Sequence, residues 1–488
     1  MLRFAAGAAV FVVAITCILI GFFGLQNWRI HRAWAVFQRE LAKAGRTLDV
    51  SAFLPGPVPD DRNFARAPVF QNLLNQGRAA ARSSPALLEA LRYVEAESGF
   101  GGSMSSSDLW SQQNFTAFKE QLGRLRLRSG TSTNRLETAR LTLEGLEPES
   151  EMLAAIAAAA QRPFFQSATN RDASAVMQTD RPALSMIERL QFLFQLRACA
   201  RAALDRTPEA ADDVLTSLRM ARLAPQSPDA RAAIRAQFMV TRSLQPIWEG
   251  LAERRWNAEQ LEAFQTELAR FHLLANHTNS IQRVVMAYIE LWRTIPAGKT
   301  VPRSVMQPGG NPVYQPAWPF LPRAWWLASC VQLYEAGQTA VGRVDVPGNR
   351  VSIGYIGSDM GGLSLDGEFY QVLQGSYSWT ANPASVAFAQ TALNQAIIAC
   401  ALERYRLAHG AFPESLEPLL PAGLEHIPND VVRGRPMIYQ RLSEDRFILR
   451  GVGPNETDDR KNSASDDWLW MYPGTTNAPA ESARDAKH

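Results

Sequence analysis

Carboxylates gather in one short stretch near the end of the chain, GVGPNETDDRKNSASDDWLWMYP, residues 451–473. Two aspartate pairs lie there among Asn, Ser and Gly residues. Calcium takes ~6–8 oxygen ligands from carboxylates, side-chain amides and backbone carbonyls. The side chains that could supply such oxygens are Asn455, Asp458, Asp459, Asp466 and Asp467. The alternative is a solvated loop in which the same side chains cap turns, and the stretch lacks the Gly and terminal Glu of an EF-hand.

Other residues that could do chemistry have no motif around them. His272 and His277 are too far apart in sequence to stack on one helical face as an HxxxH pair would. The chain has no GxSxG nucleophile elbow, no GxGxxG and no phosphate-binding loop. Cys199, Cys330 and Cys400 lie in apolar helical patterns without CxxC spacing, where a small buried side chain is the usual role. The sequence therefore assigns no catalytic residue.

The beginning of the chain predicts a membrane anchor. Residues 4–28 contain no charged residue, and at ~1.5 Å per residue this run can cross a ~30 Å hydrocarbon core. It is longer than the ~7–15 apolar residues of a signal peptide, and no small-x-small cleavage site follows it. Trp28 and Arg29 are typical of a membrane–water border. We expect an uncleaved single span in contact with the lipid bilayer, with a cleaved signal peptide as the alternative.

Charge limits the partners and leaves the orientation open. The net charge is +3 and no long basic block occurs, so we expect no nucleic acid partner. More basic residues follow the apolar run than precede it, which by the positive-inside rule would keep the rest of the chain cytoplasmic. Long domains can override that rule, so the count of charges does not decide the orientation.

Apolar periodicity predicts a mainly α-helical protein. An amphipathic helix continues over 29–44, and a Pro-rich extended strap follows at 51–70. Successive helical patterns with short connections between 134 and 295 predict a helical bundle or a short α-solenoid. Within it, Thr207 and Asn257 are expected to cap helices. The side chains expected to be largely buried are Leu190, Leu193, Phe194, Leu215 and Leu218.

The last fifth of the chain predicts a small α+β unit. The helical stripe over 392–410 ends at a Gly, and the Pro that follows prevents its continuation. A short helix is expected near 414–420, and two β-rich runs, 437–441 and 446–452, predict an antiparallel hairpin. The expected units are thus a transmembrane anchor (1–28), a membrane-proximal helix with strap and mixed region (29–133), a helical bundle (134–295), a Pro/Gly-rich region with one helix (296–391), an α+β domain (392–473) and a disordered tail (474–488).

The order of these last elements carries a resemblance. RYRLAHGAFPESLEPLLP, IPNDVVRGRPMIY, FILRGVGPNETDD and DDWLW follow one another as long helix, Gly, Phe-Pro, short helix, hairpin, acidic loop and Trp. This order resembles the C-terminal domain of type II secretion major pseudopilins of the G type. The resemblance implies that the sheet packs on the end of the long helix and that the loop binds calcium, with Asn455 at the turn and Asp466 or Asp467 as second carboxylate. Glu456 stands where that family has Gly.

The chain as a whole resembles a set of membrane-anchored bacterial proteins that share a span, a PVPDDRNFA-like strap, a helical middle and this ending. That resemblance implies an arrangement and no activity. The chain departs from pseudopilins because its span lacks an acidic residue and lies far from the α+β domain in sequence. We therefore do not expect it to be processed or polymerised as a pseudopilin.

Two functions of different class follow. The leading expectation is a non-enzymatic scaffold or interaction protein of the bacterial envelope. It would be anchored once in the inner (cytoplasmic) membrane, with the bulk of the chain periplasmic, and would contact other envelope or secretion-system proteins. The alternative is a hydrolase-like envelope enzyme of unknown substrate, with a site between the helical block and residues 296–385.

Overall fold

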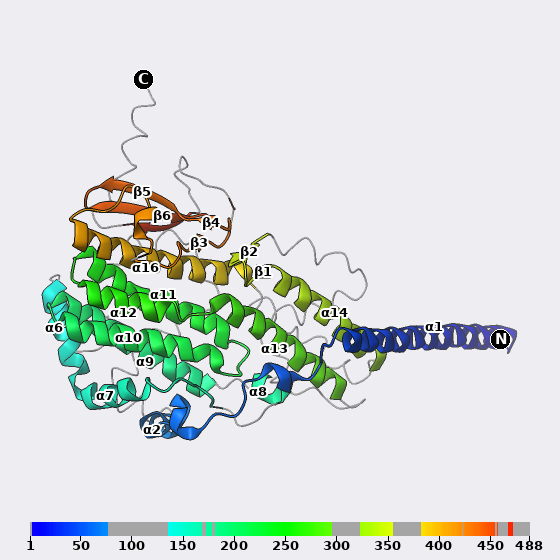
Figure 1. The fold of residues 1–488 in the computed structure, drawn as a ribbon. Coiled ribbons are helices and arrows are strands. Elements are labelled where there is room, and N and C mark those ends of the chain that lie inside the picture. Colours follow the sequence, from blue (N-terminus) through cyan, green and yellow to red (C-terminus); the bar gives the residue numbers. More distant parts are fainter. Residues whose placement is uncertain are drawn as a thin grey trace.

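The protein is mainly α-helical and carries small antiparallel sheets (Figure 1). The computed structural model describes residues 2–76, 135–167, 172–177, 181–294, 323–354, 382–421, 423–453, 456 and 467–471. The predicted mixed region beyond residue 76, the Pro/Gly-rich stretches 296–322 and 355–381, and the tail lie outside these residues. The helices are α1 (Leu2–Lys43), α2 (Pro68–Gln76), α6 (Arg135–Leu146), α7 (Ser150–Ala159), α8 (Ala173–Met177), α9 (Arg181–Ala203), α10 (Thr207–Leu223), α11 (Ala232–Ala252), α12 (Ala258–Leu268), α13 (Leu273–Thr294), α14 (Arg323–Gly342) and α16 (Pro383–His409).

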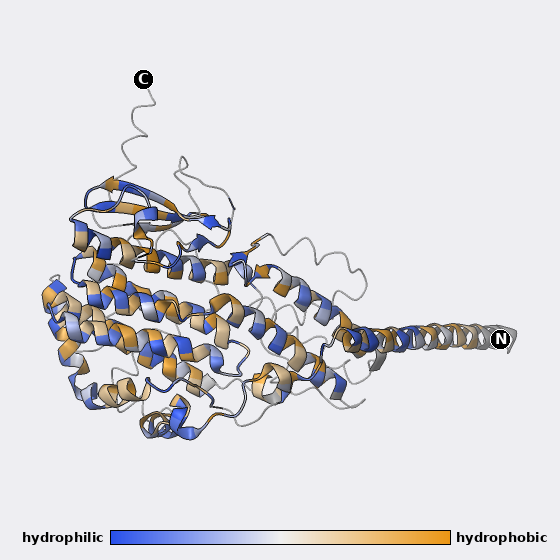
Figure 2. Ribbon diagram, viewed as in Figure 1, coloured by the Kyte–Doolittle hydropathy of each residue, from blue (hydrophilic) through white to orange (hydrophobic). Residues whose placement is uncertain are grey.

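Two of the described helices are long and apolar enough to cross a membrane, and their surroundings differ. The apolar part of α1 projects from the body (Figure 2), and the large hydrophobic side chains described there, such as Phe11, Ile18 and Phe22, are exposed. In α16, by contrast, 94% of the most apolar window is buried, so this helix belongs to the core. The N-terminal helix fits a membrane span or a signal sequence.

The second half of α1 packs against the body, as its amphipathic pattern predicts. Trp34 and Leu41 are buried, and the Phe37 ring lies edge-on to Tyr334 of α14 with centroids 5.1 Å apart. The helix ends at Lys43, and Gly45 adopts a left-handed φ of +63°, which a residue without Cβ reaches at little cost.

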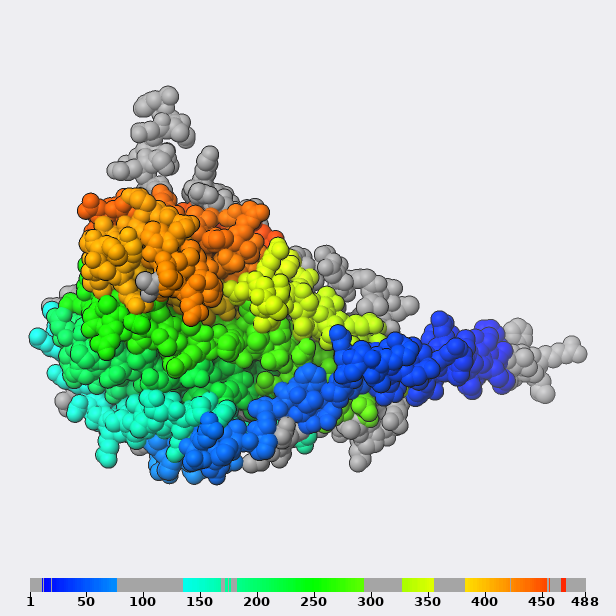
Figure 3. All heavy atoms as spheres, viewed as in Figure 1, coloured from blue at the N-terminus to red at the C-terminus, as the bar shows by residue number. Residues whose placement is uncertain are grey.

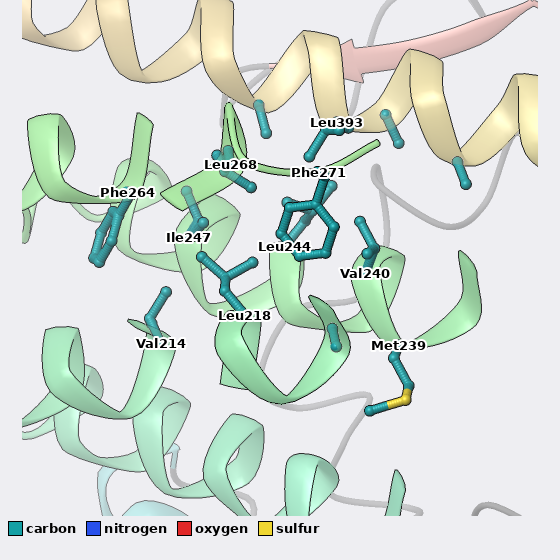
Figure 4. Packing of buried hydrophobic residues seen from close by; sticks show 14 of the residues in the cluster. Val214, Leu218, Met239, Val240, Leu244, Ile247, Phe264, Leu268, Phe271 and Leu393 are labelled. Atoms are coloured by element: carbon teal, nitrogen blue, oxygen red, sulfur yellow. The ribbon is translucent and has the colours of Figure 1, made fainter. Parts of the chain in front are cut away.

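Helices α9 to α13 pack on their neighbours, and α16 lies across α11 and α12 (Figure 1). Four of the five side chains predicted to be buried are at most 1% exposed, whereas Leu215 is only partly buried. Side chains from α10, α11, α12 and α16 meet in one continuous core (Figure 4). The same cluster extends to Trp468 and Trp470, so the C-terminal sheet and the helices share one hydrophobic interior.

The two predicted helix caps have different outcomes. Asn257 caps α12, because its side chain accepts a hydrogen bond from the Gln260 amide, and Oε1 of Gln260 accepts one from the Asn257 amide. The prediction for Thr207 is wrong, since Thr207 is the first residue of α10 and the preceding Arg206 makes no side-chain cap. Pro in the first turn fits there because that position needs no amide donor.

The C-terminal unit contains the predicted hairpin and one strand more. β5 (Ile438–Ser443) pairs antiparallel with β6 (Arg446–Gly451), and β6 pairs antiparallel with β7 (Trp468–Met471). The helix before it ends at Gly410 as predicted, but begins at Pro383, where Asn382 caps its first turn. The predicted short helix is reduced to a 3-10 turn, Glu417–Leu419. Two-residue strands form two further pairs, β1 (Val344–Asp345) with β2 (Arg350–Val351) and β3 (Asn429–Asp430) with β4 (Arg435–Pro436).

The Pro-rich strap is less extended than predicted. Three 3-10 turns, Val50–Phe53, Asp60–Arg62 and Phe64–Arg66, interrupt it. The buried Asn63 caps the third turn: its side-chain oxygen accepts from the Ala65 amide, and its Nδ2 donates to the Gln166 carbonyl. Asp49 caps the first turn in the same way. Local Asx bonds of this kind compete with an extended backbone.

Candidate functional site

The acidic loop begins and ends at paired strands. Gly451 at the end of β6 is the register partner of Trp468 at the start of β7, so the two ends of the loop lie side by side. Of the five predicted ligands, Asp467 lies within the described residues. Asn455, Asp458, Asp459 and Asp466 lie outside them, and their arrangement stays a prediction. The structure therefore places the base of the loop.

Asp467 points into the protein. Its side chain is fully buried, and Oδ2 lies 3.5 Å from Nη1 of Arg450 on the neighbouring strand. The adjacent Trp468 carbonyl accepts a 2.8 Å hydrogen bond from Nε2 of Gln395 in α16. A carboxylate that already faces a guanidinium is a poorer partner for a metal cation, because the arginine must be displaced or must share it. Within this aspartate pair, Asp466 is the better candidate ligand.

Asp430 is a buried carboxylate that sequence reasoning missed. Its Oδ1 accepts hydrogen bonds from the amides of Val432 and Arg433 at 2.9 and 3.4 Å, and Oδ2 accepts one from Val452 at 2.8 Å. Burial raises the pKa of Asp430, whereas these amide donors lower it. The Pro-Asn-Asp sequence at a turn was the available signal. Asp430 fixes the point where β6 enters the acidic loop, and its oxygens are used in doing so.

The turn into the loop contains a residue with a left-handed backbone conformation. Glu456 has a left-handed φ of +58°, and its amide donates to the Gly453 carbonyl at 3.0 Å. Glycine reaches this conformation freely, but other L residues pay ~1–2 kcal/mol for it. Glu456 thus occupies a conformation suited to Gly.

No group of three or more His, Cys, Asp or Glu side chains that could hold a metal occurs among the described residues. This statement does not cover the acidic loop, four of whose five candidate ligands lie outside that set. Asp467 and Asp430 are close to the loop but are held by Arg450 and by backbone amides. The five predicted ligands, Asn455, Asp458, Asp459, Asp466 and Asp467, therefore stay a prediction, and Asp467 already faces Arg450.

Ionic clusters also lie between helices, and two of them bear on possible chemistry. Asp213 of α10 is buried and pairs with Arg197 and Arg201 of α9, each at 2.6 Å. Burial raises the pKa of Asp213, and the two arginines oppose that shift. The cluster joins α9 to α10, which is a structural role.

The second cluster surrounds Glu249 of α11. Nε2 of Gln245 donates to it at 2.8 Å, and Arg135 of α6 lies 3.4 Å away. Burial raises the pKa of Glu249 to about 7, against the hydrogen bonds of Gln245 and Cys199 and the charge of Arg135. Burial likewise raises the pKa of the Cys199 thiol well above its usual range. A protonated thiol and an enclosed carboxyl do not make a nucleophile–base pair.

The histidines and cysteines behave as the sequence predicts. His277 is buried beside Gln237, and burial lowers its pKa to about 4, whereas His272 is exposed. Cys199, Cys330 and Cys400 are buried free thiols.

The described residues do not test the alternative enzyme site. A hollow of about 310 Å³ beside the strap is lined by Pro55, Pro57, Phe164, Phe165 and their neighbours, and it contains no carboxylate, histidine or hydroxyl side chain. The predicted enzyme site involves residues 296–385, most of which lie outside the described part of the chain. That alternative stays a prediction.

Comparison with known proteins adds no relative. No family model matches the chain, and neither a curated protein nor a solved structure matches it significantly. The resemblance to the pseudopilin domain therefore remains a prediction that rests on the residue pattern.

Proposed function

We propose that the protein is a membrane-anchored envelope scaffold whose helical body carries the C-terminal sheet as an interaction module. The observation that supports this most is the contrast between two apolar helices: the apolar side chains described in the first part of α1 are exposed, whereas α16 buries its own in the body. Exposed apolar surface of that extent needs cover, which a bilayer provides.

The packing of α16 supports the scaffold part of the proposal. α16 contacts α11 and α12 on one side and β7 on another, and it shares their hydrophobic cluster. The sheet lies at the end of the body away from α1 (Figure 3). A module joined to the body by a buried helix keeps a defined position, which suits a protein that presents a surface to partners.

Location and partners belong to the same proposal. We place α1 in the inner membrane and residues beyond it in the periplasm, where the partners would be other envelope or secretion-system proteins. The support is the pseudopilin-like order of the last elements. The calcium site is proposed on the same support, with Asn455, Asp458, Asp459 and Asp466 as ligands.

Fractionation and reporter fusions test the proposal. Full-length protein should stay in the membrane pellet after carbonate extraction, and its intact mass should include residues 1–28. A reporter active only in the periplasm, fused after His488, should be active, and a matched cytoplasmic reporter should be silent. A protein whose mass lacks the first residues would be secreted rather than anchored. The reverse reporter pattern would place the body in the cytoplasm.

A further inference from the structure

A polar pocket opens where α1 joins the body. Its volume is about 440 Å³, which falls in the ~300–1,000 Å³ range of small-molecule sites. Residues from the last turns of α1, the segment after it and the end of α13 form its wall. We call it the collar pocket, and the lining residues that matter are Gln38, Leu41, Arg46, Asp49, Glu290 and Arg293.

Neutral side chains hold the two arginines of the collar pocket. Nη1 of Arg46 donates to the Tyr334 hydroxyl and to Oε1 of Gln338 in α14, each at 3.1 Å. The Arg293 guanidinium lies over the Trp34 ring, 5.9 Å from its centroid. Within the described residues, neither arginine forms an ion pair with a carboxylate. Both cations are therefore positioned without a directly paired carboxylate in the part of the chain that the structure describes.

The two carboxylates of the collar pocket are engaged with backbone groups. Asp49 caps the following 3-10 turn, because its Oδ1 accepts from the Ser51 amide at 2.8 Å. Oε1 of Glu290 accepts from the Ala173 amide at 3.4 Å. These bonds hold the two carboxylates in place, and the arginines still have donors that no described residue accepts. The guanidinium fork matches phosphate oxygens, and Arg frequently binds phosphate through two parallel hydrogen bonds.

The surroundings favour an anion from the membrane surface. Between residues 29 and 46 the chain has five Arg or Lys residues and a single acid, Glu40, which pairs with Lys43. Trp34 follows the border residue Trp28 by less than two turns, about 9 Å along the helix axis. Arg293 beside Trp34 is thus close to the ~5–8 Å layer of lipid headgroups. Basic residues at this depth attract anionic lipid by ~1 kcal/mol each.

We propose that the collar pocket binds a phosphate group through Arg46 and Arg293. The phosphate belongs to an anionic phospholipid headgroup or is free phosphate. The lipid source rests on the proposed membrane anchorage, whereas the phosphate chemistry rests on the pocket alone. Occupation would join α1, α13 and α14 at one point and fix the angle at which the anchor meets the body.

The test uses full-length protein in a neutral detergent. The probes are dihexanoyl-phosphatidylglycerol, zwitterionic dihexanoyl-phosphatidylcholine and inorganic phosphate, and the readouts are native mass spectrometry and the thermal midpoint. Phosphatidylglycerol should bind one molecule per chain and raise the midpoint, because a ligand of the folded state stabilises it. The double variant R46Q/R293Q should lose at least about tenfold in affinity. The matched pair R32Q/R39Q removes the same charge from α1 outside the pocket and should lose clearly less affinity than R46Q/R293Q.

The three probes distinguish a lipid headgroup from free phosphate as the source of the bound phosphate group. Binding of phosphatidylglycerol without inorganic phosphate identifies a lipid site, and binding of both identifies a general phosphate site. If no anion binds, or if R46Q/R293Q binds as tightly as R32Q/R39Q, the proposal is overturned. R46K/R293K is the control for a folding defect. It keeps the positive charge at both positions and should bind with an affinity between those of the wild type and R46Q/R293Q. Carbonate extraction of the same variants reports the anchor separately, so a failed pocket and a failed anchor give different results.

Discussion

The side-chain amide of Gln395 in α16 donates a 2.8 Å hydrogen bond to the main-chain carbonyl of Trp468, the first residue of β7. Both residues are buried. This bond ties the strand that closes the acidic loop to the helix in the centre of the protein, although 73 residues separate them in sequence. The base of the loop thus depends on a long-range contact.

Gln395→Ala should destabilise the protein, because it leaves the buried Trp468 carbonyl without this donor. We expect a loss of about 1–3 kcal/mol in the free energy of unfolding, measured by denaturant titration. Amide exchange should rise most in β7. Gln440→Ala removes an exposed glutamine from β5 and should change stability by less than about 0.5 kcal/mol. Equal effects of the two variants would contradict a special role for Gln395.

Gly451→Ala should be destabilising for a steric reason. A Cβ at this position would lie 2.6 Å from Cγ2 of Thr391 in α16, so strand and helix would have to separate. Overpacking of this kind costs about 1–3 kcal/mol. Thr391→Ser removes the opposing methyl group and should recover part of the loss in the double variant. Gly342→Ala, which meets open space, serves as the control, and a Gly451→Ala protein as stable as that control would refute the close contact.

Glu249 should make stability depend on pH. Its pKa of about 7 lies above the ordinary 4.5, so the folded protein keeps the proton to a higher pH than the unfolded chain does. Its stabilising contribution is therefore complete below about pH 4.5 and is lost as the pH rises through 7. The charged groups beside it are Arg135 and Glu253, and Cys199 and Gln245 complete the surroundings. Wild-type protein should lose stability relative to Glu249→Gln between pH 5 and 8.

Wild type must be compared with Glu249→Gln because His277 changes the pH dependence of stability in the opposite direction. Its pKa is lowered from 6.5 to about 4, so its contribution grows as the pH rises through that window. Glu259→Gln, at an exposed position in the first turn of α12, is the matched control. Parallel pH profiles for wild type and Glu249→Gln would show that Glu249 does not titrate in this range.

Calcium should raise the thermal midpoint of the full-length protein if the acidic loop binds it. Asp466→Ala should remove the increment and leave the midpoint without calcium unchanged. Asp467→Asn should lower the midpoint with and without calcium, because it weakens the contact with Arg450. Magnesium, which prefers a smaller octahedral site, is the control cation. An unchanged midpoint at millimolar calcium would identify the loop as solvated turn structure.

Glu456→Gly should stabilise the turn into the loop. The left-handed φ of +58° costs an L residue ~1–2 kcal/mol, which Gly would relieve. The greater conformational freedom of Gly in the unfolded chain offsets part of this stabilisation. We expect a net increase of about 0.5–1 kcal/mol in the free energy of unfolding. Glu456→Ala keeps the strained conformation and should bring no increase, so an equal gain in both variants would point to the loss of the side chain instead.

Much of the fold could be predicted from sequence, because the relevant signals are local. The helical periods, the Gly410 and Pro413 punctuation and the two β-rich runs led to the helical middle, the end of α16 and the β5–β6 hairpin. Local order also placed the acidic loop between the hairpin and the Trp-Leu-Trp run.

The features that the sequence did not predict depend on residues that are distant along the chain. Strand β7 is only four residues long and exists because β6 offers it a ladder and α16 offers it cover. Asp213 and Glu249 could not be recognised as buried, because the arginines that accompany them come from other helices. The two apolar helices make the same point: α1 and α16 are both long and apolar enough to cross a membrane, and their packing shows which of them the body encloses. Burial is a property of the neighbours that a residue acquires on folding, and sequence patterns report those neighbours only where they are close along the chain.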